Sequence, residues 1–509
     1  MINYIRRKSS VVKVGNVCIG GNNPIRIQSM LNTSTMDTEA SVNQTVDLIK
    51  AGSELVRLTT QGEREAKNMA LIREELNKRS YNTPLVADVH FNSKVADEAA
   101  LHVEKVRINP GNYANSIDEI EHKFVPFLNL CKQHNTAIRL GVNHGSLNKR
   151  ILEKYGDTPE GMTESCMEFL RICKRENFSN VIISVKASNT RVMVQTVRQM
   201  ARRMQEEGMN FPLHLGVTEA GSGEDGRIKS AVGIGTLLSD GLGDTIRVSL
   251  SESPVAEIPV AKKIVDFISR KSKAAIIAGF DENLYNPEQY SRRETLAVGS
   301  FGGNQVPLVL TAEETLPNGV LDCVLSSDNA LGEGRLFFAN LKSKNNKQPV
   351  VLTRVYNTSD LETLQIEASI ELGPFFIDGL GDGIRIVAPN IAADIVNSLS
   401  YGILQATGAR ITKTEYISCP SCGRTLFDIE STIEKIKAAT SHLKSLKIGI
   451  MGCVVNGPGE MADADYGYVG AGVGRVSLYR GQQCVEKNIP EEQAVEHLIA
   501  LIRSDGRWV

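Results

Sequence analysis

The chain of 509 residues lacks the features expected of a membrane-bound, secreted or nucleic-acid-binding protein. No apolar run is long enough to span a bilayer, and no apolar segment follows the basic residues of Met1–Ser9, so we expect neither a membrane anchor nor a secretory signal. The formal net charge of −2 gives no electrostatic reason to expect nucleic acid as a partner. The nine cysteines are scattered and odd in number, which argues against a disulfide framework and indicates a reducing cytoplasm.

The length predicts two or three domains, and the composition, with 41% apolar and 23% charged residues, is typical of globular proteins. Changes in the sequence pattern predict a substrate-binding domain at residues 1–272, an insert at 273–410 and a metal-binding domain at 411–509.

The first of these segments alternates short apolar runs with amphipathic stretches, eight times in succession. Repeated strand–helix alternation over about 250 residues predicts an α/β fold of the (β/α)₈ TIM-barrel type. A doubly wound open sheet is the alternative, but no G-x-G-x-x-G follows the first strand. The expected strands are Pro24–Ser29, Leu55–Thr59, Leu85–His90, Lys105–Asn109, Ala137–Val142, Val181–Lys186, Leu213–Thr218 and Thr245–Leu250.

Each expected strand has polar residues at its carboxyl end, and in a TIM barrel these ends converge on one mouth, where active sites lie. A single arginine in such a place would more often be a surface residue, but four arginines and a lysine against two carboxylates are harder to explain that way. Guanidinium groups bind phosphate oxygens in pairs, so the sequence predicts a site for a ligand with more than one phosphate. The residues are Gln28 with Asn32, Arg57, Asp88 with His90, Arg107 with Asn109, Arg139 with Asn143, Lys186, Glu219, and Arg247 with Ser249.

The insert contains an internal repeat. The sequence Asp240-Gly-Leu-Gly-Asp-Thr-Ile-Arg247 recurs as Asp378-Gly-Leu-Gly-Asp-Gly-Ile-Arg385, and both copies precede an amphipathic stretch. The insert is therefore interpreted as an α/β partial duplicate of the unit that closes the barrel, with strands expected at Ala275–Ala278, Val306–Leu310 and Val350–Val355. Since Val387 stands where the first copy has Ser249, we expect a structural role, as a spacer or docking surface.

The last segment carries three cysteines and a carboxylate in turns: Cys419-Pro-Ser-Cys422, then Gly452-Cys453, then Asn456-Gly-Pro-Gly-Glu460. Each cysteine motif follows an expected strand, Glu415–Ser418 or Lys447–Met451. Three thiolates can hold three irons of a [4Fe–4S] cluster. A fourth iron with Glu460, or with no ligand, could donate electrons and act as a Lewis acid. Further strands at Tyr466–Val469, Val476–Tyr479 and Cys484–Lys487, with helices at Ile429–Leu443 and Glu491–Ile502, predict an α+β domain.

Zinc and a redox dithiol are the alternatives. A structural zinc site usually pairs one C-x₂-C with a second or with two histidines, whereas Cys453 stands alone with only His442 and Cys484 nearby in sequence. The pair Cys419 and Cys422 could by itself be a redox dithiol. A radical enzyme that uses S-adenosylmethionine is not expected, because no C-x₃-C-x₂-C occurs.

These motifs together resemble those of the 4-hydroxy-3-methylbut-2-en-1-yl diphosphate synthase family, iron–sulfur enzymes of the non-mevalonate isoprenoid pathway. The resemblance runs through nearly the whole chain, and the insert and the ending Asp505–Val509 are similar to three-domain members. The segments that carry it are Pro24–Met30, Leu85–Phe91, Val106–Asn112, Val185–Ser188, His214–Ala220, Cys419–Arg424 and Gly452–Glu460.

The resemblance implies a two-electron reductive ring opening of 2-C-methyl-D-erythritol 2,4-cyclodiphosphate, with loss of water. It implies a [4Fe–4S] cluster on Cys419, Cys422 and Cys453, with Glu460 on the fourth iron in the absence of substrate, in a domain similar to sulfite and nitrite reductase modules. A reduced ferredoxin or flavodoxin would supply the electrons to a monomer or homodimer.

In this hypothesis the barrel mouth binds the substrate and the metal-binding domain closes over it. The residues expected to hold the diphosphate are Arg57, Arg107, Arg139, Lys186, Arg247 and Ser249. Asn109 and Asn143 would orient the substrate, and Asp88, His90 and Glu219 would bound the reacting end, with Glu219 as a candidate proton source.

Two other functions stay open at this point. One is a non-catalytic iron–sulfur sensor or scaffold, which would leave the polar barrel mouth without a purpose. The other is a pterin- or phosphate-binding barrel enzyme with a structural zinc domain.

Overall fold

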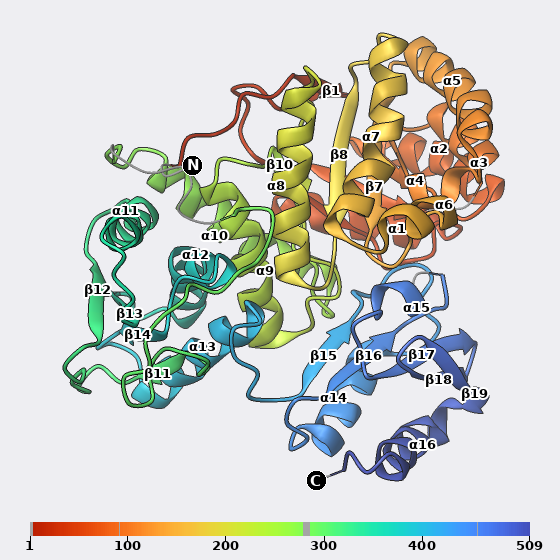
Figure 1. Cartoon of the computed structure of the whole chain (residues 1–509). Coiled ribbons are helices and arrows are strands. Elements are labelled where there is room, and N and C mark those ends of the chain that lie inside the picture. Colours follow the sequence, from red (N-terminus) through yellow and green to blue (C-terminus); the bar gives the residue numbers. More distant parts are fainter. Residues whose placement is uncertain (1–3, 91, 278–285, 456, 509) are drawn as a thin grey trace.

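The computed structural model describes residues 4–90, 92–277, 286–455 and 457–508 (Figure 1). Three sheets follow one another along the chain, of eight, four and five strands, and a two-stranded hairpin precedes them. Among the described residues no helix is both long and apolar enough to cross a membrane.

The eight-stranded sheet is a parallel barrel, as predicted. Its strand order is β8-β7-β6-β5-β4-β3-β10-β9, and a bridge from Ile183 in β8 to Leu213, just before β9, closes the ring. The predicted strands all occur, although the last two are short because the chain leaves the ladder before it reaches the polar residues of the mouth. The strands are β3 (Arg26–Met30), β4 (Leu55–Thr59), β5 (Leu85–Asp88), β6 (Lys105–Ile108), β7 (Ala137–Asn143), β8 (Val181–Lys186), β9 (His214–Leu215) and β10 (Thr245–Ile246).

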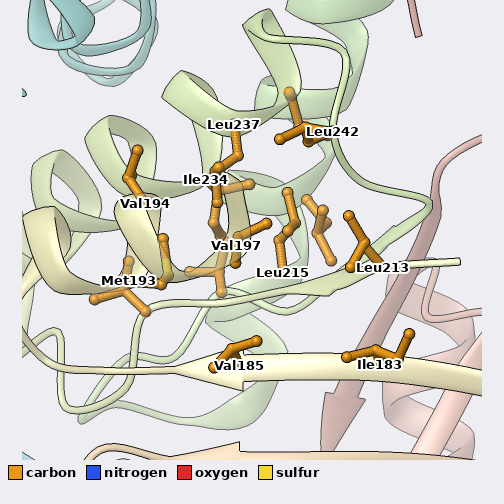
Figure 2. Close-up of a cluster of buried hydrophobic side chains, with 14 of the residues drawn as sticks. Ile183, Val185, Met193, Val194, Val197, Leu213, Leu215, Ile234, Leu237 and Leu242 are labelled. Carbon is orange, nitrogen blue, oxygen red and sulfur yellow. The ribbon is translucent and has the colours of Figure 1, made fainter. Parts of the chain in front are cut away.

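Helices cover the outside of the barrel, and most begin at a polar residue whose side chain accepts a hydrogen bond from the first turn, as Ser116, Thr158 and Asn189 do. Apolar side chains of β8, β9 and the two helices α8 and α9 interlock between sheet and helix layer (Figure 2). The helices are α1 (Thr38–Ala51), α2 (Glu63–Lys78), α3 (Ser93–Ala100), α4 (Pro110–Tyr113), α5 (Ile117–His134), α6 (Lys149–Tyr155), α7 (Pro159–Arg175), α8 (Thr190–Glu206), α9 (Gly223–Ser239) and α10 (Pro254–Lys271).

The amino-terminal end of the barrel is closed by a hairpin that the sequence pattern did not reveal. Strands β1 (Val12–Val14) and β2 (Val17–Ile19) pair antiparallel, and their buried side chains pack on the first residues of four barrel strands. Apolar residues thus close this end of the barrel, and the predicted site residues lie at the carboxyl ends of the strands.

The insert is a four-stranded parallel sheet in the order β11-β14-β13-β12. Its elements are β11 (Leu308–Leu310), β12 (Leu321–Leu325), α11 (Ala330–Ser343), β13 (Val350–Val355), α12 (Leu361–Ile377), β14 (Gly383–Val387) and α13 (Ala393–Ala406). The strand expected at Ala275–Ala278 was wrong for residues 275–277, which lie in irregular backbone, and Ala278 lies outside the described residues. Strand β12 was not predicted.

The insert repeats half of the barrel rather than its closing unit alone. The order β11-β14-β13-β12 matches β3-β10-β9-β8 strand for strand. The same hydrogen bonds recur around the repeated aspartates: Asp244 accepts from Arg6 and from the Leu213 amide, while Asp382 accepts from Arg292 and from the Val350 amide. The insert therefore contains counterparts of the first barrel strand and the last three, and no counterparts of β4–β7 follow β11.

Helices α9 and α12 pack the barrel against its partial copy. Both are buried along most of their length, so neither shows the one-sided apolar pattern of a surface helix. A methyl group on Gly235 would lie 2.5 Å from Ile370, and one on Gly373 would lie 3.0 Å from Val232. Gly235 and Val232 correspond to Gly373 and Ile370 in the repeat, so the contact has the reciprocal symmetry of an isologous dimer interface.

A buried charge network lies at the same interface. Arg198 of α8 and Arg335 of α11 each bind both repeated aspartates, Asp240 and Asp378, at 2.7–3.0 Å. All four side chains are almost fully buried. Two arginines and two carboxylates balance in charge, which makes burial of the network tolerable as long as it is complete.

The carboxyl-terminal sheet has the order β15-β16-β17-β18-β19. Strands β15, β16 and β17 pair parallel, whereas β18 pairs antiparallel with both β17 and β19. Its elements are β15 (Glu415–Ser418), α14 (Ile429–Thr440), β16 (Lys447–Met451), α15 (Gly457–Glu460), β17 (Tyr466–Gly472), β18 (Arg475–Arg480), β19 (Gln483–Pro490) and α16 (Glu491–Ser504). Helices α14 and α16 pack on one face, and this small domain lies against the mouth of the barrel (Figure 1).

Substitution of Arg335 by Met should destabilise the protein by about 3–5 kcal/mol, because it leaves two buried carboxylates to share one guanidinium. The free energy of unfolding from urea titrations measures this effect. Arg270→Gln is the matched control, since it breaks an arginine–carboxylate pair with Glu367 of α12 in which the arginine side chain is 67% exposed. That loss should stay below about 1 kcal/mol. Equal losses in the two variants would contradict the role given to the buried network.

Candidate functional site

One cavity lies between the barrel mouth and the carboxyl-terminal domain, with about 730 Å³ of empty space that is partly open to solvent. Both halves of the sequence prediction meet here. The predicted residues that line it are Arg57, Asp88, His90, Arg107, Arg139, Asn143, Lys186, Glu219, Arg247, Ser249, Cys419, Cys422, Cys453 and Glu460.

Three predicted residues of the mouth do not line the cavity. Gln28 contacts His214 inside the barrel, and Asn32 contacts Gln44 of α1. The third is Asn109. Its side chain accepts a hydrogen bond from the Gly111 amide, where it caps α4, and donates one to Ser146 Oγ. Its contacts therefore fix the loop after β6.

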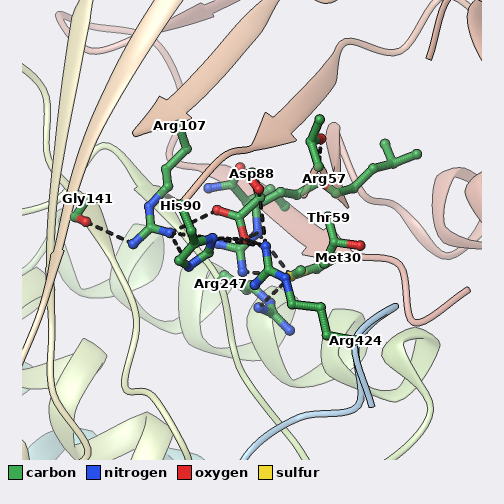
Figure 3. Close-up of polar contacts among 12 residues, drawn as sticks. Met30, Arg57, Thr59, Asp88, His90, Arg107, Gly141, Arg247 and Arg424 are labelled. Carbon is green, nitrogen blue, oxygen red and sulfur yellow. Dashed lines mark hydrogen bonds and ion pairs between the residues drawn. The ribbon is translucent and has the colours of Figure 1, made fainter. Parts of the chain in front are cut away.

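Asp88 is the counter-ion of the cationic mouth (Figure 3). Arg107 Nη1 lies 3.1 Å from its Oδ1, and Arg57 and Arg424 lie 3.9 and 3.8 Å from its Oδ2. Burial opposes ionisation of Asp88, but the surrounding guanidinium groups outweigh it and hold the pKa of this carboxyl well below its usual range. One carboxylate is thus the counter-ion of three arginines.

Arg139 has no such partner. It is 1% exposed, and its Nε and Nη1 atoms have no hydrogen-bond partner among the residues that the structure describes. Burial, together with the neighbouring cations Arg57 and Arg107, holds the pKa of this guanidinium well below its usual value. The pKa of Lys186 is lowered in the same way, by burial and by the arginines around it. Both cations would gain most from an anionic ligand.

Arg247 is paired, in contrast to Arg139. Glu257 of α10 accepts hydrogen bonds from Arg247 Nη2 at 3.0 Å and Nε at 3.2 Å, and from Ser29 Oγ. The thioether sulfur of Met30 lies between Arg247 and Arg57, and accepts from Arg57 Nη2 at 2.7 Å. Sulfur is a weak acceptor, so this contact orients the guanidinium groups without neutralising them.

His90 faces two guanidinium groups. Arg107 Nη1 lies 2.7 Å from its Nε2, and Arg424 Nη2 lies 2.9 Å from its Nδ1. Burial holds the pKa of His90 well below its usual value, and the nearby arginines lower it further, so the ring is neutral. With both ring nitrogens facing cationic donors, His90 is poorly placed to act as a fourth ligand of a zinc site beside the three cysteines.

Two of the carboxylates that line the cavity, Glu219 and Glu460, lie next to each other at the domain boundary. Asn143 Nδ2 donates to Glu460 Oε1 at 2.6 Å, and Asn143 Oδ1 accepts from Arg107. Glu219 lies beside Glu460 in a left-handed conformation at φ 48°. Burial raises the pKa of Glu219 well above its usual value, and the neighbouring Glu460 raises it further.

The three cysteines come from two loops that follow β15 and β16. Among the described residues no three Cys, His, Asp or Glu side chains are close enough to share one metal ion. A [4Fe–4S] cube, however, binds each thiolate through a different iron. Backbone amides fit this use, since Gly452 N donates to Cys419 Sγ at 3.2 Å and Val455 N donates to the thiol of Cys453.

Burial raises the pKa of the Cys419 and Cys453 thiols, and the neighbouring Cys422 raises it further in each case. Thiolates at these positions therefore need a bound cation. A metal cluster supplies one, so the donor set and its surroundings fit the cofactor.

The carboxyl-terminal domain contacts the barrel of its own chain around the cavity. Ser251 Oγ lies 2.8 Å from Ser418 Oγ and donates to the carbonyl of Cys419, and Lys229 binds Glu415 at 2.8 Å. Gly145 and Gly459 touch through their backbones, and a methyl group on Gly145 would lie 2.0 Å from Gly459 O. The two halves of the site thus come together within a single chain.

Several residues of the site were missed in the sequence. Met30 and Arg424 line the cavity, and Glu257 neutralises Arg247 from behind it. Arg424 lies two residues after Cys422, so the motif itself pointed to it. Glu257 lies on a helix and carries no signal in the sequence. Phe91 and Asn456, which belong to the motifs, lie outside the described residues.

Two family models match this chain. The profile of the GcpE TIM-barrel domain matches residues 9–262, and that of the GcpE protein C-terminal domain matches residues 415–504. The two matches cover the segments that face each other across the cavity.

Full-length relatives extend this likeness to the whole chain. A protein of Parabacteroides distasonis named 4-hydroxy-3-methylbut-2-en-1-yl diphosphate synthase (flavodoxin) is 49% identical over 611 aligned positions, with 100% of this chain and 99% of the relative covered. A protein of Bacteroides thetaiotaomicron with the same name is 50% identical over 607 positions, with the same coverage. Both alignments are longer than this chain, so the relatives have residues without a counterpart here.

Substitution of Gly145 by Ala should keep the carboxyl-terminal domain from seating on the barrel, because the added methyl group collides with Gly459. Small-angle X-ray scattering should show a larger radius of gyration, and activity should be lost. Gly156→Ala is the control: its φ of 69° is positive, as is the 79° of Gly145, but the nearest atom, in Thr158, is 3.4 Å away and in the same domain. A compact, active Gly145→Ala protein would contradict the closed arrangement.

Proposed function

Because this chain belongs to the GcpE family of 4-hydroxy-3-methylbut-2-en-1-yl diphosphate synthases, we propose that its barrel mouth binds the cyclic diphosphate substrate and that the three cysteines opposite hold a [4Fe–4S] cluster. The activity of the chain is the reductive conversion of 2-C-methyl-D-erythritol 2,4-cyclodiphosphate to 4-hydroxy-3-methylbut-2-enyl diphosphate, a step of isoprenoid biosynthesis. The assignment of residues to this reaction is our inference.

One observation carries the assignment. Five cationic side chains of the barrel line the cavity from one side, and three thiols of the carboxyl-terminal domain line it from the other. Guanidinium groups match phosphate oxygens, while thiols match iron. A substrate bound through its phosphates to the barrel would therefore present its ring to the cysteine loops.

The unpaired cations are the primary diphosphate ligands in this proposal. Among the residues that the structure describes, no carboxylate lies at hydrogen-bond distance from the buried Arg139 or Lys186, and Arg57 pairs with Asp88 only at 3.9 Å. Burial lowers the pKa of Arg57 to about 10, so it still carries its charge at neutral pH. Arg107, Arg247 and Ser249 complete the binding surface, and Asp88 is the anion that the diphosphate displaces from the guanidinium groups.

The reacting end of the substrate would lie toward Glu219, Asn143 and His90. A cluster on Cys419, Cys422 and Cys453 supplies electrons and a Lewis-acidic iron when bound. Asn143 fixes the Glu460 carboxylate, which is the candidate fourth ligand in the absence of substrate. Glu219 lines the cavity beside Glu460 and is the candidate proton source for the hydroxyl group that leaves as water.

Closure over the mouth would exclude water, which strengthens the electrostatic interactions inside the site and protects reduced intermediates. Because the cavity closes within one chain, we propose that a single chain forms a complete site. The electron donor is proposed to be a flavodoxin, supported by the printed name of the relatives. A reducing compartment such as the cytoplasm suits the nine free cysteines.

Substitution of Cys453 by Ser should abolish activity and the cluster, because one iron loses its thiolate. Iron and acid-labile sulfide content after anaerobic purification measure the cluster. Electron paramagnetic resonance of the reduced wild-type protein, with and without the cyclic diphosphate, tests its contact with substrate. Cys484→Ser is the matched control, since Cys484 lies in β19 of the same domain and does not line the cavity. A cluster-loaded, active Cys453→Ser protein, or a wild-type spectrum indifferent to substrate, would refute the assignment.

Substitution of Arg139 or Arg247 by Gln should raise KM by about 10- to 100-fold, because a charge-assisted hydrogen bond contributes about 1.5–3 kcal/mol. The two variants should differ in stability. Arg139→Gln removes an unpaired buried charge, so its melting temperature should be unchanged or higher. Arg247→Gln leaves Glu257 buried without its partner, so its melting temperature should fall. An unchanged KM in both variants would count against the diphosphate site.

A further inference from the structure

Arg424 crosses from the cysteine-bearing domain into the barrel mouth. Its Nη2 atom donates to the backbone oxygen of Asp88 at 3.2 Å and lies 2.9 Å from His90 Nδ1 and 3.8 Å from Asp88 Oδ2. The side chain is 6% exposed, and its position beside Asp88 and His90 is visible in Figure 3. A residue of one domain thus belongs to the charge network of the other.

The loop that carries Arg424 is fitted to this position. Arg424 follows Cys422 by two residues, and a methyl group on the intervening Gly423 would lie 2.6 Å from Thr33 O and 2.7 Å from Thr59 Oγ1. Glycine is therefore required for the loop to lie against the barrel. The position of Arg424 is consequently coupled both to a cysteine of the cluster site and to the seating of the domain.

The contacts of Arg424 in the barrel are weak for a structural anchor. A neutral imidazole accepts a hydrogen bond at only one ring nitrogen, yet Arg424 and Arg107 approach the two nitrogens of His90 from opposite sides. Asp88 already serves Arg57 and Arg107. Arg424 Nε has no hydrogen-bond partner in the described part of the chain.

The positive charge of Arg424 also makes its position in the barrel mouth energetically unfavourable. Closure brings the guanidinium of Arg424 into a mouth that already holds Arg57, Arg107, Arg139, Lys186 and Arg247. Like charges in a buried site repel strongly, and only an anion reverses the sign of that interaction. The arrangement is therefore most favourable when a polyanion lies among these groups.

We propose that Arg424 is a positioning residue that couples closure of the cysteine-bearing domain to the binding of the anionic substrate. Closure adds a guanidinium to the diphosphate site, and a bound diphosphate in turn stabilises the closed form. The coupling is reciprocal, as linkage requires, so the substrate is held more tightly in the closed form by the same factor. This inference rests on the proposed function, because it takes the barrel mouth as the diphosphate site.

The prediction concerns the ligand dependence of closure. In the wild type, inorganic pyrophosphate or the cyclic diphosphate should shift a fluorescence energy-transfer pair, with one dye on the barrel and one on the cysteine-bearing domain, toward the short distance. In Arg424→Gln the shift should be lost, and KM for the cyclic diphosphate should rise about 5- to 150-fold, the usual range of such coupling. Arg424→Lys keeps the charge and should restore part of both effects.

Arg475→Gln is the matched control, because Arg475 begins β18 of the same domain, is exposed and donates to Asn488 O. Iron content and melting temperature, measured on every variant, separate coupling from damage to the fold. If Arg424→Gln lost its iron, KM and ligand-induced closure would be compared between Arg424→Lys and the wild type instead.

Unchanged KM and unchanged ligand-induced closure in Arg424→Gln would overturn the inference and leave the proposed function standing. The same holds if Arg424→Gln and Arg424→Lys lose activity equally while KM and closure stay as in the wild type. Failure of the wild-type protein to bind the cyclic diphosphate at all would instead refute the proposed function.

Discussion

The central constraint on this protein is the shortage of negative charge in the barrel mouth. Asp88 faces three arginines, and Glu257 pairs with Arg247. In the described part of the chain, no carboxylate lies at hydrogen-bond distance from the buried Arg139 or Lys186. Burial of unpaired charge costs several kcal/mol, so this arrangement is unfavourable for folding and is tolerated because the rest of the barrel is tightly packed. A polyanionic substrate turns the same excess of charge into binding energy.

The cysteine-bearing domain faces this excess of positive charge. It seats on the mouth through backbone contacts at Gly145 and through Ser251, and it places three thiols opposite the cations. Burial raises the pKa of two of these thiols, so thiolates there need a metal just as the arginines need an anion. Substrate and cofactor each supply the charge that one side of the cavity lacks.

The insert repeats part of the barrel's architecture. Its four strands and the repeated aspartates reproduce half of the barrel, and α9 packs on α12 with the reciprocity of a dimer interface. At its strand ends the arginines are paired with carboxylates, Arg385 with Asp322 and Arg354 with Glu371. In the barrel the corresponding position, Arg247, has Ser249 two residues further along and faces the cavity.

The sequence by itself determined the barrel, the polar residues at its mouth and the three-cysteine motif. Alternation of strands and helices admits few topologies, and a parallel barrel brings all strand ends to one side. Only the tertiary structure decided which of these residues act together. Pairing depends on distances between segments far apart in the chain. Helix α10 provides the carboxylate that pairs with Arg247, no segment that the structure describes provides one for Arg139, and the side chain of Asn109 caps α4. Arg424 reaches Asp88 across 336 positions of sequence, which no local pattern can encode.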